Sequence, residues 1–506
     1  MRGQLAFALA ALSALSVIVA VLSFGLRPDA FFVGDPGVKL ASTRNALRFP
    51  THPLNIPLPA IGTEGTPHVE SFFAVHGDHA HAVTSEFFPL LSAPMLAAFG
   101  LRGLYVLPAL GFISTLAACA WLAVVLDPRR NAALVVLAAA VGTPFLFYGL
   151  EYWEHTLALA SGVAGTALLL DAARRRTGRH ADAGAAFAAG LLMGAAIVLR
   201  PEAACYTAAV VLGSRTLVHR PTWRSLAVAA AGISAALLPL EVYTIVHFGS
   251  FVPGHISANA GLVDGLWPGE RLHLASDWLL PSGWNTAGPL RMSSFWSVAP
   301  AAIFGVAAFA MRRDRKERPF LASVAIVTTL LVVLTAPNDG GGQWGPRYLL
   351  FAYVPLVLSA ADAVQRFRRG IASAMLIVVL LAACVWVQRA AYRQLRGAKA
   401  TYGRVVDFVA RNTRPSGPVV TDVWWLDQIA SSAVDRGTFL FAGEATTGHD
   451  IVRRLSDARV AEVTVFRSRE VSADLDGWTP ASCYEEQARE ELDVRGLVAI
   501  RLGLHC

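Results

Sequence analysis

Long apolar stretches alternate with short polar connections over most of the chain. Most stretches approach the roughly 20 residues that a helix needs to cross the hydrocarbon core of a bilayer. They lie at 5–24, 104–126, 131–149, 156–172, 181–199, 203–218, 225–247, 295–311, 320–336, 348–364 and 371–389. This pattern predicts an α-helical polytopic membrane protein with about 11 transmembrane helices.

Composition and charge support this class. Of 506 residues, 55% are apolar and only 16% are charged, which excludes an ordinary soluble multidomain protein. The first apolar stretch is too long for a cleaved signal peptide and predicts a retained anchor. The net charge of +7 comes largely from arginine-rich connections. No basic and aromatic platform accompanies it, so we expect no nucleic-acid partner.

The arginine-rich connections predict the orientation in the membrane. They lie at 129–130, 174–179, 215–224, 312–318 and 366–369, and the parity of the spans puts all of them on one side. Because Lys and Arg gather in cytoplasmic connections, that side is predicted to be the cytoplasm. In the cytoplasmic (inner) membrane, the N-terminus is then inside, and residues 25–103 and everything after 390 are outside.

One apolar stretch, Phe87–Phe99, is predicted not to cross the membrane. It has thirteen residues and contains Pro89 and Pro94, so it is too short and too interrupted for an ordinary span. We expect instead a helix within 86–100 that lies in the membrane interface.

Residues 391–506 are less apolar, and strand-like patterns alternate with helix-like ones. Helices are predicted at Tyr402–Arg411, Trp424–Ala433, Ile451–Ala458 and Cys483–Glu491, and strands at Pro418–Asp422, Thr438–Ala442, Val460–Arg467 and Leu497–Leu502. This order predicts a small extracytoplasmic α/β domain after a membrane module that comprises residues 1–390.

The five cysteines fall into two groups. Cys119, Cys205 and Cys384 lie in predicted spans, where an unpaired cysteine is most often a small core residue. Cys483 and Cys506 lie in the exterior domain, where an oxidising compartment permits a bond. We predict that these two form a disulfide; the alternative is two free thiols.

Ionisable and polar residues recur at the exterior ends of the spans. They are Asp35, Glu151, Glu154, His155, Arg200, Glu202, Gln343 and Arg347. Such groups are costly at a membrane unless they face a cavity, so their repetition predicts a site there. Asp35 could act as a general base if the bundle walls partly desolvate it. The alternative for its Asp-Pro-Gly sequence is an ordinary turn.

The cations near this site have two interpretations. Arg347 could grip a phosphate through its planar fork, with Lys39, one of only three lysines, and Arg200 as further candidates. Alternatively, the arginines extend to the interface or pair with Glu202 and Glu151.

Other residues near these spans also allow two interpretations. Glu154 and His155 could contact a sugar or an acceptor, or simply cap the helix that follows them. Trp344 could stack on a sugar face or anchor the chain at the interface. A divalent cation could bind a cluster in the exterior loop; the alternative is a solvated group of side chains. The cluster comprises His76, Asp78, His79 and His81.

The order of these features resembles the GT-C class of membrane glycosyltransferases, close to the branch of protein mannosyltransferases and lipid A aminoarabinose transferases. In that class a first span leads to an exterior loop that opens with a catalytic aspartate and closes with an interfacial helix followed by Phe-Gly. The corresponding residues here are Asp35, 88–100, 152–156, 199–203 and 342–348. Many relatives carry paired acids where this chain has Asp35-Pro36.

The resemblance implies an inverting transfer of a sugar from a polyprenyl-phosphate donor to a glycan, lipid or protein acceptor outside the membrane. Asp35 would deprotonate the acceptor hydroxyl, and Arg347, with Lys39 or Arg200, would hold the leaving phosphate. The implied substrate contacts are Glu151, Glu154, His155, Glu202, Gln343 and Trp344.

Two other functions stay open at this point. A transporter or flippase for a lipid-linked saccharide would need the same cationic rim but no base. It should also line both leaflets with polar residues, whereas this chain concentrates them on one side. A non-catalytic subunit for cell-envelope assembly would tolerate loss of the Asp35 carboxylate.

Overall fold

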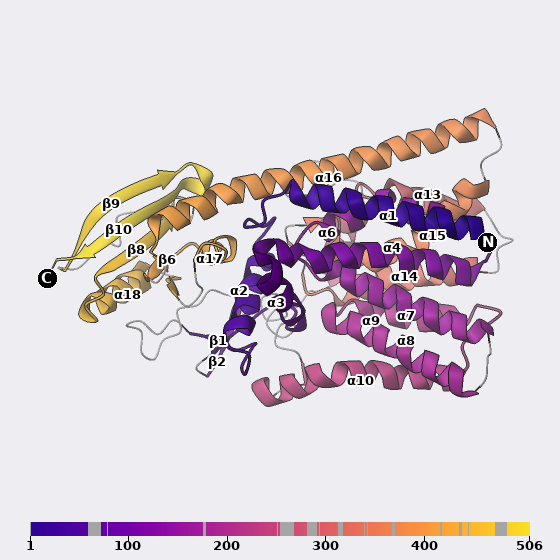
Figure 1. The fold of residues 1–506 in the computed structure, drawn as a ribbon, viewed down its shortest axis with the longest axis horizontal. Helices are drawn as coiled ribbons and strands as arrows, with labels where there is room; N and C mark the ends of the chain where they lie inside the picture. The colour runs from indigo at the N-terminus through magenta and orange to yellow at the C-terminus, as the bar shows by residue number, and fades with distance from the viewer. Residues whose placement is uncertain are drawn as a thin grey trace. The chain divides into compact units, whose positions relative to one another are not determined.

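The computed structural model describes most of the chain (Figure 1). The described residues are 2–58, 72–77, 79–175, 179–249, 251–252, 268–280, 291–292, 294–311, 317–338, 340–341, 343–366, 370–414, 417–434, 438–443, 445–470 and 483–505. The chain divides into two compact units. The first comprises Met1–Gly25, Leu104–Pro253 and Asn259–Leu395, and the second Leu26–Gly103, Gly254–Ala258 and Arg396–Cys506.

The first unit is a helical bundle. Its helices are α1 (Arg2–Phe24), α4 (Val106–Leu126), α5 (Ala132–Gly142), α6 (Phe145–Gly149), α7 (His155–Arg175), α8 (Arg179–Leu199), α9 (Ala203–Ser214), α10 (Trp223–Phe248), α12 (Pro268–Leu279), α13 (Pro300–Met311), α14 (Arg318–Thr335), α15 (Leu350–Arg366) and the beginning of α16 (Ile371–Asn412). In the described residues, eight helical segments are long and apolar enough to cross a membrane, and three further apolar helices are shorter. These positions confirm the predicted polytopic helical architecture.

Close helix packing holds the bundle together. Helices α4, α7, α8 and α10 lie side by side (Figure 1). A Cβ atom added at Gly190 of α8 would come within 2.0 Å of the backbone oxygen of Ala229 in α10. Small residues at such points let two helix backbones approach closely, which is how helices pack where no water drives association.

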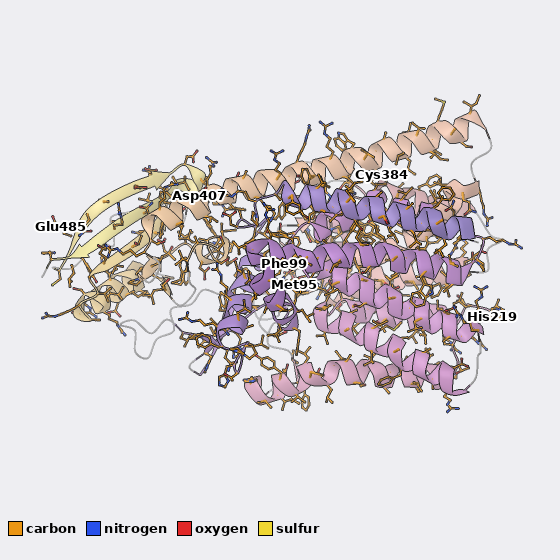
Figure 2. All side chains as sticks on the ribbon, in the orientation of Figure 1. Met95, Phe99, His219, Cys384, Asp407 and Glu485 are labelled. Atoms are coloured by element: carbon orange, nitrogen blue, oxygen red, sulfur yellow. The ribbon has the colours of Figure 1, made fainter. Side chains whose placement is uncertain are left out.

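The arginine-rich connections meet at one end of this bundle. Arg130 Nη2 lies 3.0 Å from Glu317 Oε1, and its Nε lies 3.9 Å from Asp362 Oδ1. Arg174 donates to the backbone oxygen of Val125, at the end of α4. His219 lies at the same end as the chain's N-terminus (Figures 1 and 2). The described residues of these connections therefore share one side of the bundle, while the compartment that this side faces stays a prediction.

The second unit contains a mixed sheet covered by helices. Its strands are β6 (Val419–Thr421), β7 (Phe439–Phe441), β8 (Glu462–Ser468), β9 (Tyr484–Leu492) and β10 (Leu497–Leu504). The order is β7-β6-β8-β10-β9; β6 pairs in parallel with β7 and β8, and β10 is antiparallel to β8 and β9. One apolar cluster includes Phe408 of α16, and another includes Ile451 of α18 (Ala445–Asp457). This arrangement confirms the small C-terminal sheet domain.

Two predicted helices of this domain were wrong in type or length. Cys483–Glu491 was expected to be a helix, but Tyr484–Leu492 forms the edge strand β9. Its Glu, Gln and Ala residues favour a helix locally, and pairing with β10 along its length overrides that preference. Trp424–Ala433 contains only the short helix α17 (Leu426–Ile429).

The segment 26–103 belongs to this second unit. It contains α2 (Asp35–Arg48), β1 (Ile56–Pro57), β2 (Phe73–His76), β3 (His79–Ala82) and α3 (Phe87–Phe99). The last of these lies within the predicted 86–100 helix and ends at Phe99. Gly100, whose positive φ of 59° suits glycine, begins the 3₁₀ helix η1 (Gly100–Tyr105). The Asp-Pro-Gly sequence is not an isolated turn, because it forms the first turn of α2, where proline is favoured.

Candidate functional site

The candidate site of the first unit is built from three connections at one end of the bundle. They are 150–154 before α7, 200–202 between α8 and α9, and 338–347 before α15. Pro201 disfavours helical backbone at the preceding residue, so α8 ends at Leu199. The φ of 70° at Gly345 turns the third connection toward the 3₁₀ helix η3 (Arg347–Leu349).

Arg200 is held by two carboxylates. Its Nη1 donates to Glu154 Oε1 at 3.1 Å, and its Nε donates to Glu202 Oε1 at 2.8 Å. The side chains are only 12%, 1% and 9% exposed, respectively. Charges this deep need partners, so the three residues form one structural group. The alternative interpretation, in which an arginine pairs with Glu202, therefore holds for Arg200, and Glu154 is an additional partner.

Tyr348 brings the second arginine into the same group. The guanidinium carbons of Arg200 and Arg347 lie 5.5 and 5.4 Å from the centroid of its ring. Its hydroxyl donates to Asn338 Oδ1 at 3.1 Å, which fixes the ring. Gln343 supports this arrangement, because its Oε1 accepts the backbone N–H of Arg347 at 2.8 Å. The two predicted phosphate cations of the bundle therefore lie around one aromatic ring.

Aromatic side chains pack beneath this polar group. The ring of His155, at the first residue of α7, lies 4.8 Å from the Tyr148 ring and 5.3 Å from the Trp153 ring. Trp344 is 1% exposed and stacks on Phe147 at 5.9 Å. Its side chain is thus buried in the first unit, and its predicted stacking on a sugar or anchoring at the interface stays untested.

Buried charge also lies in this region. The side chains of Glu151, Glu154 and His155 are at most 2% exposed. Burial of charged groups is expensive and concentrates at functional or ion-paired positions. Glu154 meets this requirement through its ion pair with Arg200, while a substrate contact for Glu154 and His155 stays a prediction.

Asp35 and Lys39 lie one helical turn apart in the second unit. Asp35 is the first residue of α2 and is half-buried, and Lys39 is 1% exposed. A helix N-terminus carries partial positive charge, which suits an acidic residue at this position. An ionised and partly accessible carboxylate is the form in which aspartate accepts a proton.

The predicted metal cluster lies partly outside the described residues. The side chain of His76 and the whole of Asp78 are not described, whereas His79 and His81 lie on β3, with His81 buried. In the described part of the chain, no three His, Cys, Asp or Glu side chains are grouped as metal ligands. The metal site stays a prediction.

The predicted disulfide is described at one end. Cys483 is disulfide-bonded, and its backbone oxygen accepts the N–H of His505 at 3.0 Å. Cys506 lies outside the described residues, so the pairing of these two cysteines stays a prediction. Cys119, Cys205 and Cys384 are free, as expected for span cysteines.

Two residues of the arginine group were not among the site residues predicted from the sequence. Tyr348 follows Arg347 directly. Asn338 lies ten positions before Tyr348, at the start of the connection 338–347. Both lie in a polar, glycine-rich stretch that also contains Gln343 and Arg347. This pattern could have signalled their participation, but their contact depends on the fold of the glycine-rich connection.

Known proteins share this fold at low sequence identity. No protein-family model and no curated protein match the sequence. The structure of ArnT from Cupriavidus metallidurans in the apo state gives a TM-score of 0.62 at 14% identity over 97% of both chains. Its structure with bound undecaprenyl phosphate gives 0.61 at 12% identity, again over 97% of both chains.

A second known protein is similar over less of its own length. The Archaeoglobus fulgidus oligosaccharyltransferase, tethered through a disulfide to an acceptor peptide containing the NVT sequon, gives a TM-score of 0.53 at 14% identity. The match covers 97% of this chain and 74% of that one. Together with ArnT, this likeness shows that the chain is a multi-pass membrane protein with the GT-C fold.

Proposed function

We propose that the protein is a membrane glycosyltransferase that moves a sugar from a polyprenyl-phosphate carrier to an acceptor hydroxyl. The placement of Arg200 and Arg347 around Tyr348, at one end of the bundle, carries this proposal. A guanidinium matches phosphate geometry, and ArnT, which has this fold, has been solved with undecaprenyl phosphate bound. The acceptor is a glycan, a lipid or a protein on the outer face of the cytoplasmic membrane.

The reaction is a single displacement with inversion at the anomeric carbon. The acceptor oxygen bonds to the anomeric carbon while the bond from that carbon to the phosphate oxygen breaks. Asp35 receives the acceptor proton, and polyprenyl phosphate leaves with the bonding electron pair. Arg347 stabilises the charge that grows on this leaving group. Arg200 has two carboxylate partners, so its primary role is to hold the connections together.

The experiment that tests this proposal measures sugar transfer from a panel of undecaprenyl-phosphate sugars in nanodiscs. It compares Asp35→Asn with the wild type at equal protein levels. Asparagine keeps the size of the side chain but cannot accept the proton, so turnover should fall by roughly 10²–10⁴-fold. Undecaprenyl-phosphate binding should be retained. Asp493→Asn is the control, because Asp493 is an exposed carboxylate of the same unit. Near-normal turnover by Asp35→Asn would remove this base from the mechanism.

A further inference from the structure

The helix that begins with Asp35 contacts the C-terminal segment through two glycines. A Cβ atom added at Gly34 would lie 1.7 Å from Gln428 Oε1, and one added at Gly37 would lie 1.6 Å from the Gln428 backbone oxygen. Both distances are far below van der Waals contact. Gly37 faces backbone, so only glycine at that position allows α2 and α17 to approach this closely, whereas a side chain at position 34 would collide with the Gln428 amide.

Gln428 itself is fixed in place. It is 2% exposed, its Nε2 donates to the backbone oxygen of Trp424 at 3.1 Å, and its own backbone oxygen accepts the hydroxyl of Ser431 at 3.1 Å. Side chain and backbone are therefore both restrained. Gln428 therefore presents a rigid surface to Gly34 and Gly37.

A second contact fixes the other half of α2. The Arg44 guanidinium donates to the backbone oxygens of Ser431 and Ser432, at 3.0 Å for Ser432. Ser432 also donates its hydroxyl to the backbone oxygen of Asp29, just before α2. With Gly34 and Gly37 at one end and Arg44 at the other, the rotation and the axial position of the helix are both defined.

We propose that Gln428 is a positioning residue for Asp35, so that the C-terminal segment sets the geometry of the base. This inference rests on the proposed function. Asp35 lies between the two glycines in sequence, and successive side chains on a helix differ by about 100° in direction. The carboxylate therefore leaves α2 on a different face from the one that contacts Gln428.

A double-mutant cycle separates the Gln428 side chain from its backbone. Gly34→Ala places a methyl group against the Gln428 amide and should lower turnover on the order of tenfold, since a shift of about 1 Å in a catalytic group is costly. Adding Gln428→Ala removes that amide and should restore turnover to the level of Gln428→Ala alone. Gly37→Ala should not be restored by Gln428→Ala, because its methyl group meets a backbone oxygen.

The kinetic pattern distinguishes positioning from general damage. Gly34→Ala should lower the turnover number at unchanged undecaprenyl-phosphate binding, and Gln428→Ala should reverse any accompanying loss of melting temperature. A lower melting temperature together with weaker binding, or no rescue by Gln428→Ala, would overturn the positioning role.

A cysteine pair tests the contact without any activity assay. A Cβ at position 34 would lie 3.1 Å from the Cβ of Gln428, slightly below the roughly 3.5–4.5 Å of natural disulfides. Gly34→Cys with Gln428→Cys should therefore link in the full-length protein, as seen by mass spectrometry of non-reduced peptides. Gly397→Cys with Gln428→Cys is the control and should not link, because a Cβ at 397 has no neighbour within 4 Å.

The two proposals fail in distinguishable ways. In one outcome the cysteine pair links and Asp35→Asn keeps its turnover. The contact between α2 and α17 is then confirmed, but Asp35 is not the base, and the positioning role of Gln428 is rejected with it. In the other outcome Asp35→Asn loses turnover, and the cysteine pair either does not link or links to give an inactive protein. Only the positioning role of Gln428 is then overturned.

Discussion

The side chain of Arg347 offers the most direct test of phosphate binding. Replacement by Lys keeps the charge but removes the planar fork that binds phosphate through two hydrogen bonds. Loss of one charged hydrogen bond costs about 1.5–3 kcal/mol, so donor affinity should fall by roughly 10- to 100-fold. Binding of undecaprenyl phosphate to Arg347→Lys and Arg347→Ala in nanodiscs measures this. Unchanged affinity in Arg347→Ala would assign the residue to its contact with Tyr348 alone.

Sequence patterns offered the nearby partner of Arg200 as one alternative and did not indicate its distant partner. Glu202 is two positions away, and the pair could be expected from spacing. Glu154 lies 46 positions away, and its contact with Arg200 depends on how α7 and α8 pack. Which ionisable residues occur at the ends of the spans is thus predictable, whereas their pairing is a property of the folded bundle.

At the scale of elements, an ion-pair group fixes the start of segment 26–103 to α16. Arg27 binds Asp407 through two hydrogen bonds of 2.9 Å and also binds Asp29. Asp407 lies on the C-terminal part of α16 (Figure 2). Hydrogen bonds from Arg27 lower the pKa of both aspartates. An acid with a lowered folded-state pKa stabilises the fold at neutral pH.

Asp407→Asn should therefore destabilise the protein at pH 7 by about 1 kcal/mol, since the pair is partly exposed. The difference from the wild type should shrink as the pH falls below about 4, where the aspartates of the unfolded chain are protonated. Thermal unfolding across this pH range measures it. Asp493→Asn, which breaks the more exposed pair with Arg404, is the matched control and should have a smaller effect. Equal effects at pH 7 would contradict the role of the bidentate pair.

Helices and strands could be predicted from the sequence where the apolar periodicity is strong. They could not be predicted where pairing with another strand determines the secondary structure. The parallel strands β6, β7 and β8 are mostly buried, carry alternating or continuous apolar residues, and were identified from their sequences. The edge strand β9 is mostly charged and exposed, and its helix-favouring residues gave the wrong prediction. An edge strand needs only one partner, and no local pattern records the presence of β10.

For the whole molecule, the sequence supported the membrane class and the GT-C fold, because helix number, polar ends and the order of motifs are all encoded locally. It did not indicate that Leu26–Gly103 would join the C-terminal segment in one unit. That association rests on contacts such as those of Gly34 and Gly37 with Gln428, about 390 positions apart. Glycine pairs of this kind are common in turns, so their role in a long-range contact is visible only in the fold.

The orientation of the whole molecule is the last prediction. Arginine-rich connections share one end of the bundle, and positive charge at the membrane favours the cytoplasmic side. We therefore expect an alkaline-phosphatase fusion after residue 400 to be active, because this enzyme folds only outside, and one after residue 315 to be inactive. Reporter fusions that are fluorescent only in the cytoplasm should give the reciprocal pattern and control for expression. An active fusion at 315 with an inactive one at 400 would invert the bundle, place the Arg200–Arg347 group inside the cell, and contradict a lipid-linked donor delivered from the outer face.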